Sequence, residues 1–301
     1  MDRVRNAEAA RSTIAVGDYT PPVLTILSTG PYFVSRQPVL SAMVYDATAG
    51  PDTGTVSLSL DGTPIATSLQ GLDGGGNLGA WQTGAPLRTP VTTGGLAYLN
   101  GRLYSIGGGG ASGAIAEVDV GTLSGDEPVS WTPTASLPQP EAAPGIATLA
   151  GGLYVLGGFS SGGSGQATNV VYYARPDASS GLVSSWGIGP TLPYPLDFID
   201  AVGLGVADSF LYAIGGRDAT GTPHNYVYVT RVDQGSGAPL GWTAATPLPV
   251  PLEYAEAAQW NGRIYVLGGL TANDNAAVSV HVYSSAVDPT TGALDPAWRD
   301  E

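Results

Sequence analysis

Five acidic residues recur at matching places along the chain and are the first candidates for chemistry. Asp197 and Asp200 flank the start of an apolar run, Glu253 and Glu256 stand at the corresponding places one repeat later, and Glu141 lies nearby one repeat earlier. Converging carboxylates repel one another, which favours a bound cation or raised pKa values. We expect them to ring one mouth of a channel, where Ca²⁺ is the single cofactor they would suit. Solvated turn residues that cap loop backbone are the plainer interpretation.

Two further side chains belong to this predicted mouth, Arg217 and His224, in a loop after a glycine pair. The chain has no cysteine and only 2 histidines, His224 and His281. Two isolated histidines do not make a zinc site, and thiolate ligands, cysteine nucleophiles and disulfides are excluded. We therefore predict no catalytic residues, and the plainer interpretation of both histidines is a solvated or packed side chain.

The charge balance excludes several partners. There are 25 acidic and 11 basic residues, for a formal net charge of −14. No basic patch is available for phosphate groups, so neither nucleic acid nor an anionic membrane surface is expected. No apolar run is long enough to cross a membrane, and residues 1–20 show no signal peptide. Only 12% of residues are charged and none is lysine, which favours an extracellular or cell-surface protein.

The composition predicts an all-β fold. The chain contains 44 Gly and 24 Pro, yet 43% of its residues are hydrophobic and it has 6 Trp and 15 Tyr. Disordered chains lack such aromatic content. A fold of many short strands joined by turns that contain Gly and Pro explains both the Gly and Pro content and the hydrophobic and aromatic content.

An internal repeat of about 50 residues organises most of the chain, a period typical of propeller blades. Four apolar runs end in a glycine pair, at Gly107-Gly108, Gly157-Gly158, Gly215-Gly216 and Gly268-Gly269. Five tryptophans follow the same rhythm, Trp81, Trp131, Trp186, Trp242 and Trp298. The glycine pairs let backbones approach closely, and the tryptophans should pack between neighbouring units.

Each unit shows the same elements in order. A Pro-rich turn precedes a first strand, as at residues 145–149 or 255–260, and a tight turn such as Asn100-Gly101 or Asn261-Gly262 follows. The second strand carries the Leu-Tyr motif, and a third strand, an Asp/Gly loop and the tryptophan strand complete four antiparallel strands. Helix should form less than about a tenth of the chain, against an average near a third. Six apolar residues are expected to be buried, Leu153, Val155, Leu211, Ile214, Ile264 and Leu267.

This order of features resembles the kelch repeat family over Trp81 to Trp298, including Leu-Pro-x-Pro turns such as the one at 192–195. The resemblance implies an all-β, kelch-like β-propeller of four-stranded blades. The family often has arginine after that turn, whereas here Glu141, Asp197 and Glu253 stand there. The family's copper enzyme needs a Cys–Tyr crosslink and histidine ligands, so the resemblance does not extend to that chemistry.

The beginning of the chain lacks the glycine-pair signature. We expect an arm at residues 1–20, a degenerate first blade at 21–90, and four kelch-like units at 91–301, giving five blades in all. Residues 71–81 match the loop and tryptophan of the later units. The alternative for 21–90 is a partial immunoglobulin-like segment, although such a sandwich needs about 100 residues.

These observations predict a non-catalytic extracellular or cell-surface propeller that presents a loop face to a protein or a glycan. One alternative is a sugar-acting propeller enzyme of epimerase or glycosidase type. Another is a homo-oligomeric subunit of a surface assembly or filament that uses N-terminal strand exchange. A converging set of acid, arginine and tyrosine at the mouth would favour the enzyme, and a mouth lined by Ser and Gly would favour binding.

Overall fold

The structure is a computed structural model that describes residues 83–124, 127–160, 166–205, 209–272 and 277–301, with four short strands before them. Two compact units are present, Met1–Thr83 and Gly84–Glu301. The first unit contains two antiparallel pairs, β1 (Val23–Ile26) with β2 (Ala42–Tyr45) and β3 (Leu58–Leu60) with β4 (Thr63–Ile65). The predicted arm at 1–20 and most of the predicted first blade, Trp81 included, lie outside the described residues.

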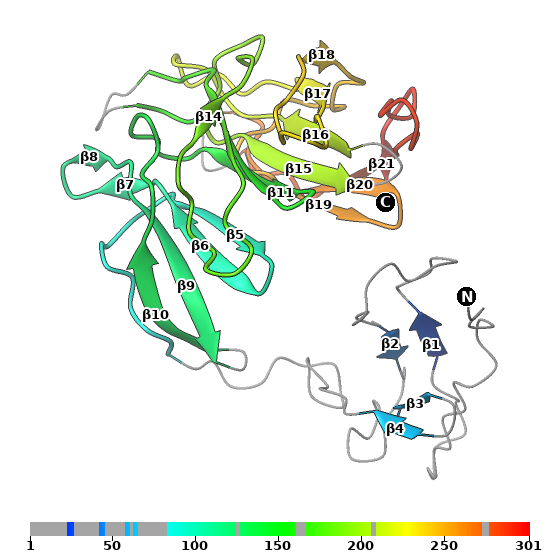
Figure 1. The fold of residues 1–301 in the computed structure, drawn as a ribbon. Helices are drawn as coiled ribbons and strands as arrows, with labels where there is room; N and C mark the ends of the chain where they lie inside the picture. Colours follow the sequence, from blue (N-terminus) through cyan, green and yellow to red (C-terminus); the bar gives the residue numbers. More distant parts are fainter. Residues whose placement is uncertain are drawn as a thin grey trace. The chain divides into compact units, whose positions relative to one another are not determined.

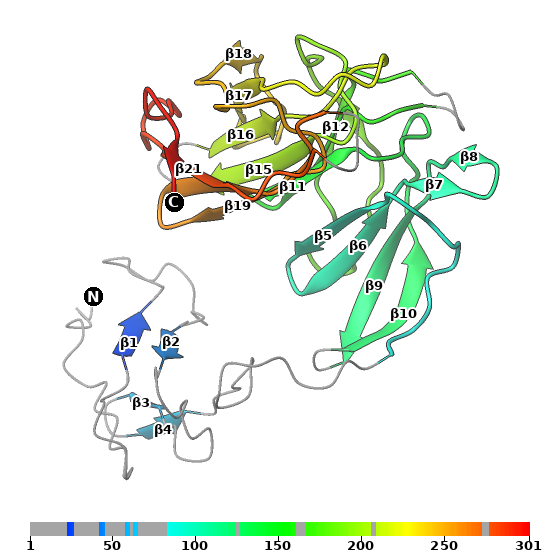
Figure 2. The same ribbon diagram turned by 180° about the vertical axis from the view of Figure 1, so that it is seen from behind.

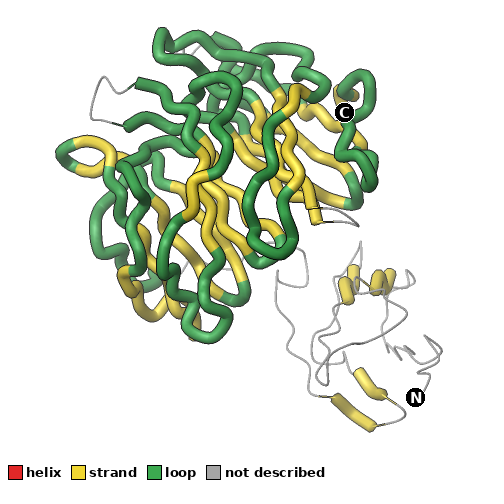
Figure 3. The backbone as a smooth tube through the Cα atoms, turned by 45° about the horizontal axis from the view of Figure 1, so that its top comes forward, coloured by secondary structure: helices red, strands yellow, loops and turns green. Residues whose placement is uncertain are grey.

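The second unit contains strands and loops, and no helix occurs among its described residues (Figure 3). Consequently no described helix is long and apolar enough to span a membrane. The strands form four antiparallel four-stranded sheets. The first sheet contains, in spatial order, β5 (Gly95–Leu99), β6 (Arg102–Ile106), β9 (Val118–Ser124) and β10 (Glu127–Pro133). A small hairpin of β7 (Gly109–Gly110) and β8 (Gly113–Ala114) leaves this sheet after β6.

The next three sheets repeat one simple up-and-down order. The second has β11 (Gly145–Leu149), β12 (Gly152–Leu156), β13 (Val171–Ala174) and β14 (Gly187–Ile188). The third has β15 (Asp200–Gly205), β16 (Ser209–Ile214), β17 (Val227–Arg231) and β18 (Thr243–Ala244). The fourth has β19 (Glu256–Trp260), β20 (Arg263–Leu267), β21 (Val282–Ala286) and β22 (Arg299–Asp300). The predicted first strands at 145–149 and 255–260 are therefore confirmed.

The first strands of successive sheets lie against one another, and later strands step outward from them (Figures 1 and 2). Successive side chains of a strand point to opposite faces of its sheet. The second and third sheets therefore each pack against one neighbouring sheet on either face. In β12, Leu153 and Val155 pack toward the first sheet, whereas Tyr154 and Leu156 pack toward the third. This is a propeller-like arrangement of sheets around a common inner edge.

Three apolar clusters separate the four sheets, one between each neighbouring pair. Five of the six residues that the sequence placed in the core are buried, Leu153, Val155, Leu211, Ile214 and Ile264. The prediction for Leu267 is wrong, because it is 43% exposed on the far face of the fourth sheet. The far face of the first sheet likewise exposes Leu96 and Tyr98.

Turn geometry agrees with the residues present. Asn100 and Gly101, and likewise Asn261 and Gly262, all have positive φ, which is the geometry of a tight two-residue hairpin. In the glycine pairs, a Cβ at Gly157 would lie 2.3 Å from the carbonyl oxygen of Leu196. Glycine is needed there because backbone from the next sheet's entry occupies the space.

The repeated tryptophans join each outer strand to the segment that enters the same sheet. Their indole nitrogens donate to backbone carbonyls more than 45 residues earlier in the chain, as in Trp186 to Ala135 at 2.8 Å and Trp298 to Thr246 at 3.0 Å. Trp186, Trp242 and Trp298 also pack on the cluster between their own sheet and the preceding one. The prediction that they lie between neighbouring units is confirmed for these three, although only Trp298 is fully buried.

Candidate functional site

A continuous chain of backbone hydrogen bonds links the four sheets at the end where their first strands begin. The amide of Ala143 donates to the carbonyl of Thr93 at 2.9 Å, Phe198 donates to Ala143 at 3.1 Å, and Tyr254 donates to Phe198 at 3.3 Å. Each residue comes from the segment that enters a different sheet, so these four form one continuous edge along the sheets. We call them the rim residues.

All four rim residues adopt a left-handed backbone conformation, with φ between 46° and 54°. None of them is glycine, although left-handed geometry costs an L-residue about 1–2 kcal/mol. Such outliers concentrate where side chains serve a function. Here the geometry presents a threonine hydroxyl at one end of the rim and two aromatic rings at the other.

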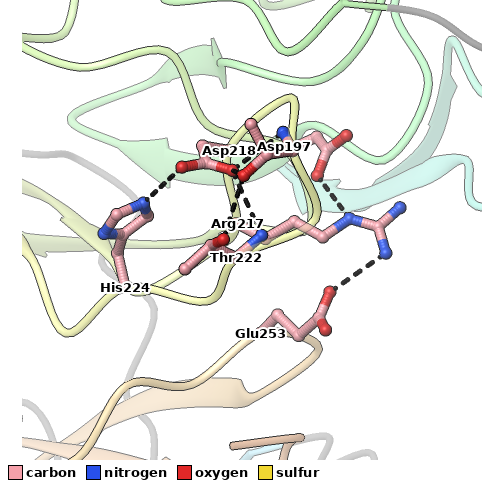
Figure 4. Close-up of polar contacts among 7 residues, drawn as sticks. Asp197, Arg217, Asp218, Thr222, His224 and Glu253 are labelled. Atoms are coloured by element: carbon pink, nitrogen blue, oxygen red, sulfur yellow. Dashed lines mark hydrogen bonds and ion pairs between the residues drawn. The ribbon is translucent and has the colours of Figure 1, made fainter. Parts of the chain in front are cut away.

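An ion cluster lies beside the aromatic end of the rim, and Figure 4 shows its members Asp197, Arg217 and Glu253. The Arg217 Nε lies 3.0 Å from Oδ1 of Asp197, and its Nη1 lies 3.3 Å from Oε2 of Glu253. The guanidinium carbon sits 4.4 Å from the Phe198 ring centroid and 5.8 Å from that of Tyr254. One cation therefore joins the third and fourth sheets through two carboxylates and two aromatic faces.

Burial controls the charge state of this cluster. Asp197 is 5% exposed and Glu253 is fully buried. Burial raises the pKa of both carboxyls, and the Arg217 guanidinium acts against that rise. Neither side-chain oxygen of Glu253 receives a hydrogen bond from the described residues. The carboxylates thus hold Arg217 against the two rings, of which Tyr254 is exposed and Phe198 is partly buried.

Glu141 is buried away from this cluster, at a position that is leucine in the next two repeats. The amide of Gly108 donates to the Glu141 carbonyl, just as Gly158 donates to Leu196 and Gly216 to Leu252. The Oε2 atom of Glu141 accepts a hydrogen bond from the Thr168 hydroxyl at 3.2 Å, whereas its Oε1 atom has no hydrogen-bond partner among the described residues. Burial raises the pKa of Glu141 to about 7.

Asp200 and Glu256 stand at the starts of β15 and β19 and do not join the Arg217 cluster. Asp200 accepts hydrogen bonds from the backbone amides of Ala201 and Ala257, which connects the third sheet to the fourth. Burial raises the pKa of Asp200 to about 7. Glu256 is exposed. The five carboxylates therefore do not form one cluster: Asp197 and Glu253 meet at Arg217, whereas Glu141 and Asp200 have other partners and Glu256 is exposed.

His224 supports a loop instead of facing the rim. Its Nε2 lies 3.0 Å from Oδ2 of Asp218, and its ring stacks on Tyr226 at 4.6 Å. Partial burial raises the pKa of Asp218, but hydrogen bonds from Thr220 and His224 outweigh it and lower the pKa overall. In the described part of the chain, no group of three or more His, Asp or Glu is placed to hold a metal ion. The space between the Asp197 and Glu253 carboxylates, where a metal ion could be expected, is occupied by the guanidinium of Arg217.

The other end of the rim borders a hollow of about 540 Å³. Its lining consists of Thr92, Thr93, the β7–β8 hairpin and Phe159. Thr92 and Gly109 bond to each other through both backbone groups, at 2.9 and 2.6 Å. No charged side chain lines this hollow, and its polar groups are hydroxyls and hairpin backbone. The loops that follow the first two glycine pairs supply most of this lining, at residues 109–114 and at Phe159, and loops at these places are predictable from the repeat.

Phe159 connects the hollow to the aromatic end. Its backbone pairs with Ala142, next to the rim residue Ala143. Its ring centroid lies 6.1 Å from that of Phe198, which in turn lies 3.9 Å from that of Tyr254. The three aromatic residues belong to the second, third and fourth sheets, so only the assembled sheets bring them together.

Comparison with known proteins gives a likeness in fold. No family model matches the sequence, and no curated protein matches it. Among solved structures, YjhT superposes with a TM-score of 0.53 at 18% sequence identity, covering 72% of this chain and 67% of that chain. At this identity the likeness concerns the fold alone. The kelch resemblance seen in the sequence stays a prediction.

Proposed function

We propose that this chain is a non-catalytic glycan-binding protein that acts outside the cell, and that the rim and its neighbours bind the ligand. One observation carries the proposal: the adjoining rings of Phe198 and Tyr254 lie on the same hydrogen-bonded rim as the exposed Thr93, so two aromatic rings and a hydroxyl share one edge. Sugar rings present C–H faces to aromatic rings and hydroxyls to polar groups. The low charge of the chain supports an extracellular location.

The burial of the acidic groups favours binding over catalysis. A general acid or base must come within hydrogen-bond reach of the reacting atoms. Asp197, Glu253 and Glu141 are all 5% exposed or less, and both Asp197 and Glu253 contact Arg217. Tyr254, by contrast, is 47% exposed. The accessible groups can hold a ligand, whereas the acids lie beneath them.

One observation favours the alternative of a sugar-acting enzyme. Asp197, Arg217 and Tyr254 converge at the mouth, as such an enzyme would require. If the enzyme interpretation is correct, the protein speeds anomer exchange or glycoside cleavage in a bound sugar, and Arg217→Met abolishes that activity. We expect one-dimensional proton NMR of protein–sugar mixtures to show neither reaction above the rate without protein.

The binding proposal is tested on an array of neutral and acidic glycans. We expect the wild-type chain to bind neutral glycans, and Tyr254→Ala and Phe198→Ala to lose at least tenfold in affinity. The matched control is Ile188→Ala, which removes an exposed apolar side chain from the outer strand β14 of the second sheet. Retained binding in both rim variants, or binding only to a protein partner in a pull-down, would overturn the proposal.

We further propose that the fold is a kelch-like propeller of five blades, with residues 21–90 as a degenerate first blade. The sheet order, the repeated glycine pairs and the exposed apolar faces at Leu96 and Leu267 support this, because monomers rarely leave broad apolar faces bare. A five-blade ring predicts a monomer of 30.5 kDa by light scattering. Obligate oligomers or filaments would instead support the strand-exchanging assembly.

A further inference from the structure

The ligand-accessible groups are spread along the rim. The tilted ring pair of Phe198 and Tyr254 lies at one end. The hollow beside Thr93 lies at the other, and Phe159 stands between them. A single small ligand on the Phe198–Tyr254 pair would leave the hollow unused. A ligand of several linked units would contact both ends.

The chemistry of the two ends is similar enough for one kind of repeating unit. Each end combines an aromatic face with polar groups: Phe159 with Thr92, Thr93 and Ser112 in the hollow, and Tyr254 with Arg217 at the far end. Pockets for uncharged ligands commonly combine aromatic walls with a few convergent polar groups. Sugar units joined in a chain fit this alternation, since each unit has an apolar face and a hydroxylated edge.

Charge selects against acidic sugars. The hollow has no charged lining residue. At the aromatic end, one guanidinium faces two carboxylates, Asp197 and Glu253, so the cluster has no positive charge to spare. The whole chain has a net charge of −14, which repels anionic ligands at low ionic strength.

We propose that the rim binds a linear, uncharged oligosaccharide across two subsites, one at Phe198 and Tyr254 and one in the hollow next to Phe159. This inference rests on the proposed glycan-binding function and names its ligand class. The Phe198–Tyr254 pair is the primary subsite, because the exposed Tyr254 ring adjoins Phe198 and the Arg217 guanidinium holds both rings in place. The hollow adds affinity only when the ligand is long enough to reach past Phe159.

The test is isothermal titration with malto-, cello-, manno- and chito-oligosaccharides of one, three and five units, and with oligogalacturonates of the same lengths. In one neutral series we expect the pentasaccharide to bind at least tenfold more tightly than the monosaccharide. The acidic series should bind at least tenfold more weakly than the neutral series of equal length. Equal affinity for monosaccharide and pentasaccharide, or preference for the acidic series, would overturn the inference while the glycan-binding function stands.

Variants separate the two subsites. Phe159→Ala should weaken pentasaccharide binding at least fivefold and change monosaccharide binding less than twofold, whereas Tyr254→Ala should weaken both. Ile188→Ala is the control and should change neither. If Phe159→Ala affects both lengths equally, the hollow is not a separate subsite. If no saccharide of any length binds the wild type, the proposed function itself fails, which is a different outcome from loss of the length dependence.

Discussion

The hydroxyl of Tyr212 donates a hydrogen bond of 2.8 Å to the backbone carbonyl of Gly292, across the boundary between the third and fourth sheets. The same relationship joins Tyr104 to Gly181 and Tyr154 to Gly237, each at 2.9 Å. In every case the tyrosine of the Leu-Tyr motif reaches the Asp/Gly loop of the following sheet. Successive sheets are therefore tied by a buried polar bond as well as by apolar packing.

Removal of this hydroxyl should destabilise the fold. Tyr212→Phe leaves the Gly292 carbonyl without its donor, and an unsatisfied buried polar group costs about 1–3 kcal/mol. Urea unfolding measures the loss. Tyr265→Phe is the matched control, because Tyr265 holds the same place in the fourth sheet and makes no such bond within the described residues. Similar losses in both variants would show that the bond does not stabilise the sheet boundary.

Alanine substitutions at two glycines distinguish the stability cost of backbone strain from the cost of a steric clash. A Cβ at Gly151 would have open space around it and only a positive φ of 78°, so Gly151→Ala should cost about 1–2 kcal/mol. At Gly158 the φ is 105° and a Cβ would lie 2.8 Å from the Ala142 carbonyl oxygen. Gly158→Ala should therefore be clearly more destabilising in the same unfolding assay. A smaller effect at Gly158 would contradict the close approach of the rim backbone.

Glu141 should make stability depend on pH. Its pKa is raised by burial to about 7 from a usual value of 4.5. The folded chain therefore binds more protons than the unfolded chain between these values, and stability falls as pH rises through this window. Glu141→Leu restores the residue found at Leu196 and Leu252, and removes the penalty.

The measurement compares Glu141→Leu with the wild type by urea unfolding at pH 4.5 and pH 8. We expect the variant to gain about 1–3 kcal/mol more at pH 8 than at pH 4.5. Glu117→Leu removes an exposed carboxylate and serves as the control. A stability difference that does not change with pH would show that Glu141 does not titrate in this window.

The repeat tryptophans should differ in importance according to their burial. Trp298 is 8% exposed, so Trp298→Ala should cost about 3–5 kcal/mol. Trp186 makes the same kind of indole hydrogen bond but is only partly buried, so Trp186→Ala should cost clearly less. Thermal and urea unfolding of the two variants give the ranking. A larger loss at Trp186 would contradict the burial seen at the sheet boundaries.

The sequence alone determined the repeating unit. The glycine pairs, the Leu-Tyr motif and the Asn-Gly turns each act locally, because they specify a close backbone approach, a strand and a tight turn at fixed places. For this reason the strand at 145–149 and the burial of Leu153 and Leu211 could be predicted. Leu267 has the same local pattern but lies on a face that no described sheet covers, so its exposure could not be read from its neighbours.

The site depended on tertiary structure. Repeat alignment identified Asp197, Glu253 and Arg217 as candidates, but it could not show that one guanidinium joins both carboxylates across two sheets. The same alignment grouped Glu141, Asp200 and Glu256 with them, although Glu141 and Asp200 have other partners and Glu256 is exposed. Phe198 and Tyr254 hold the same place in successive repeats, after Leu-Asp and Leu-Glu, whereas Phe159 follows a glycine pair, so only the packing of the sheets shows that the three rings adjoin. Side chains far apart in sequence meet because successive sheets share an inner edge, and that edge exists only once the sheets have assembled.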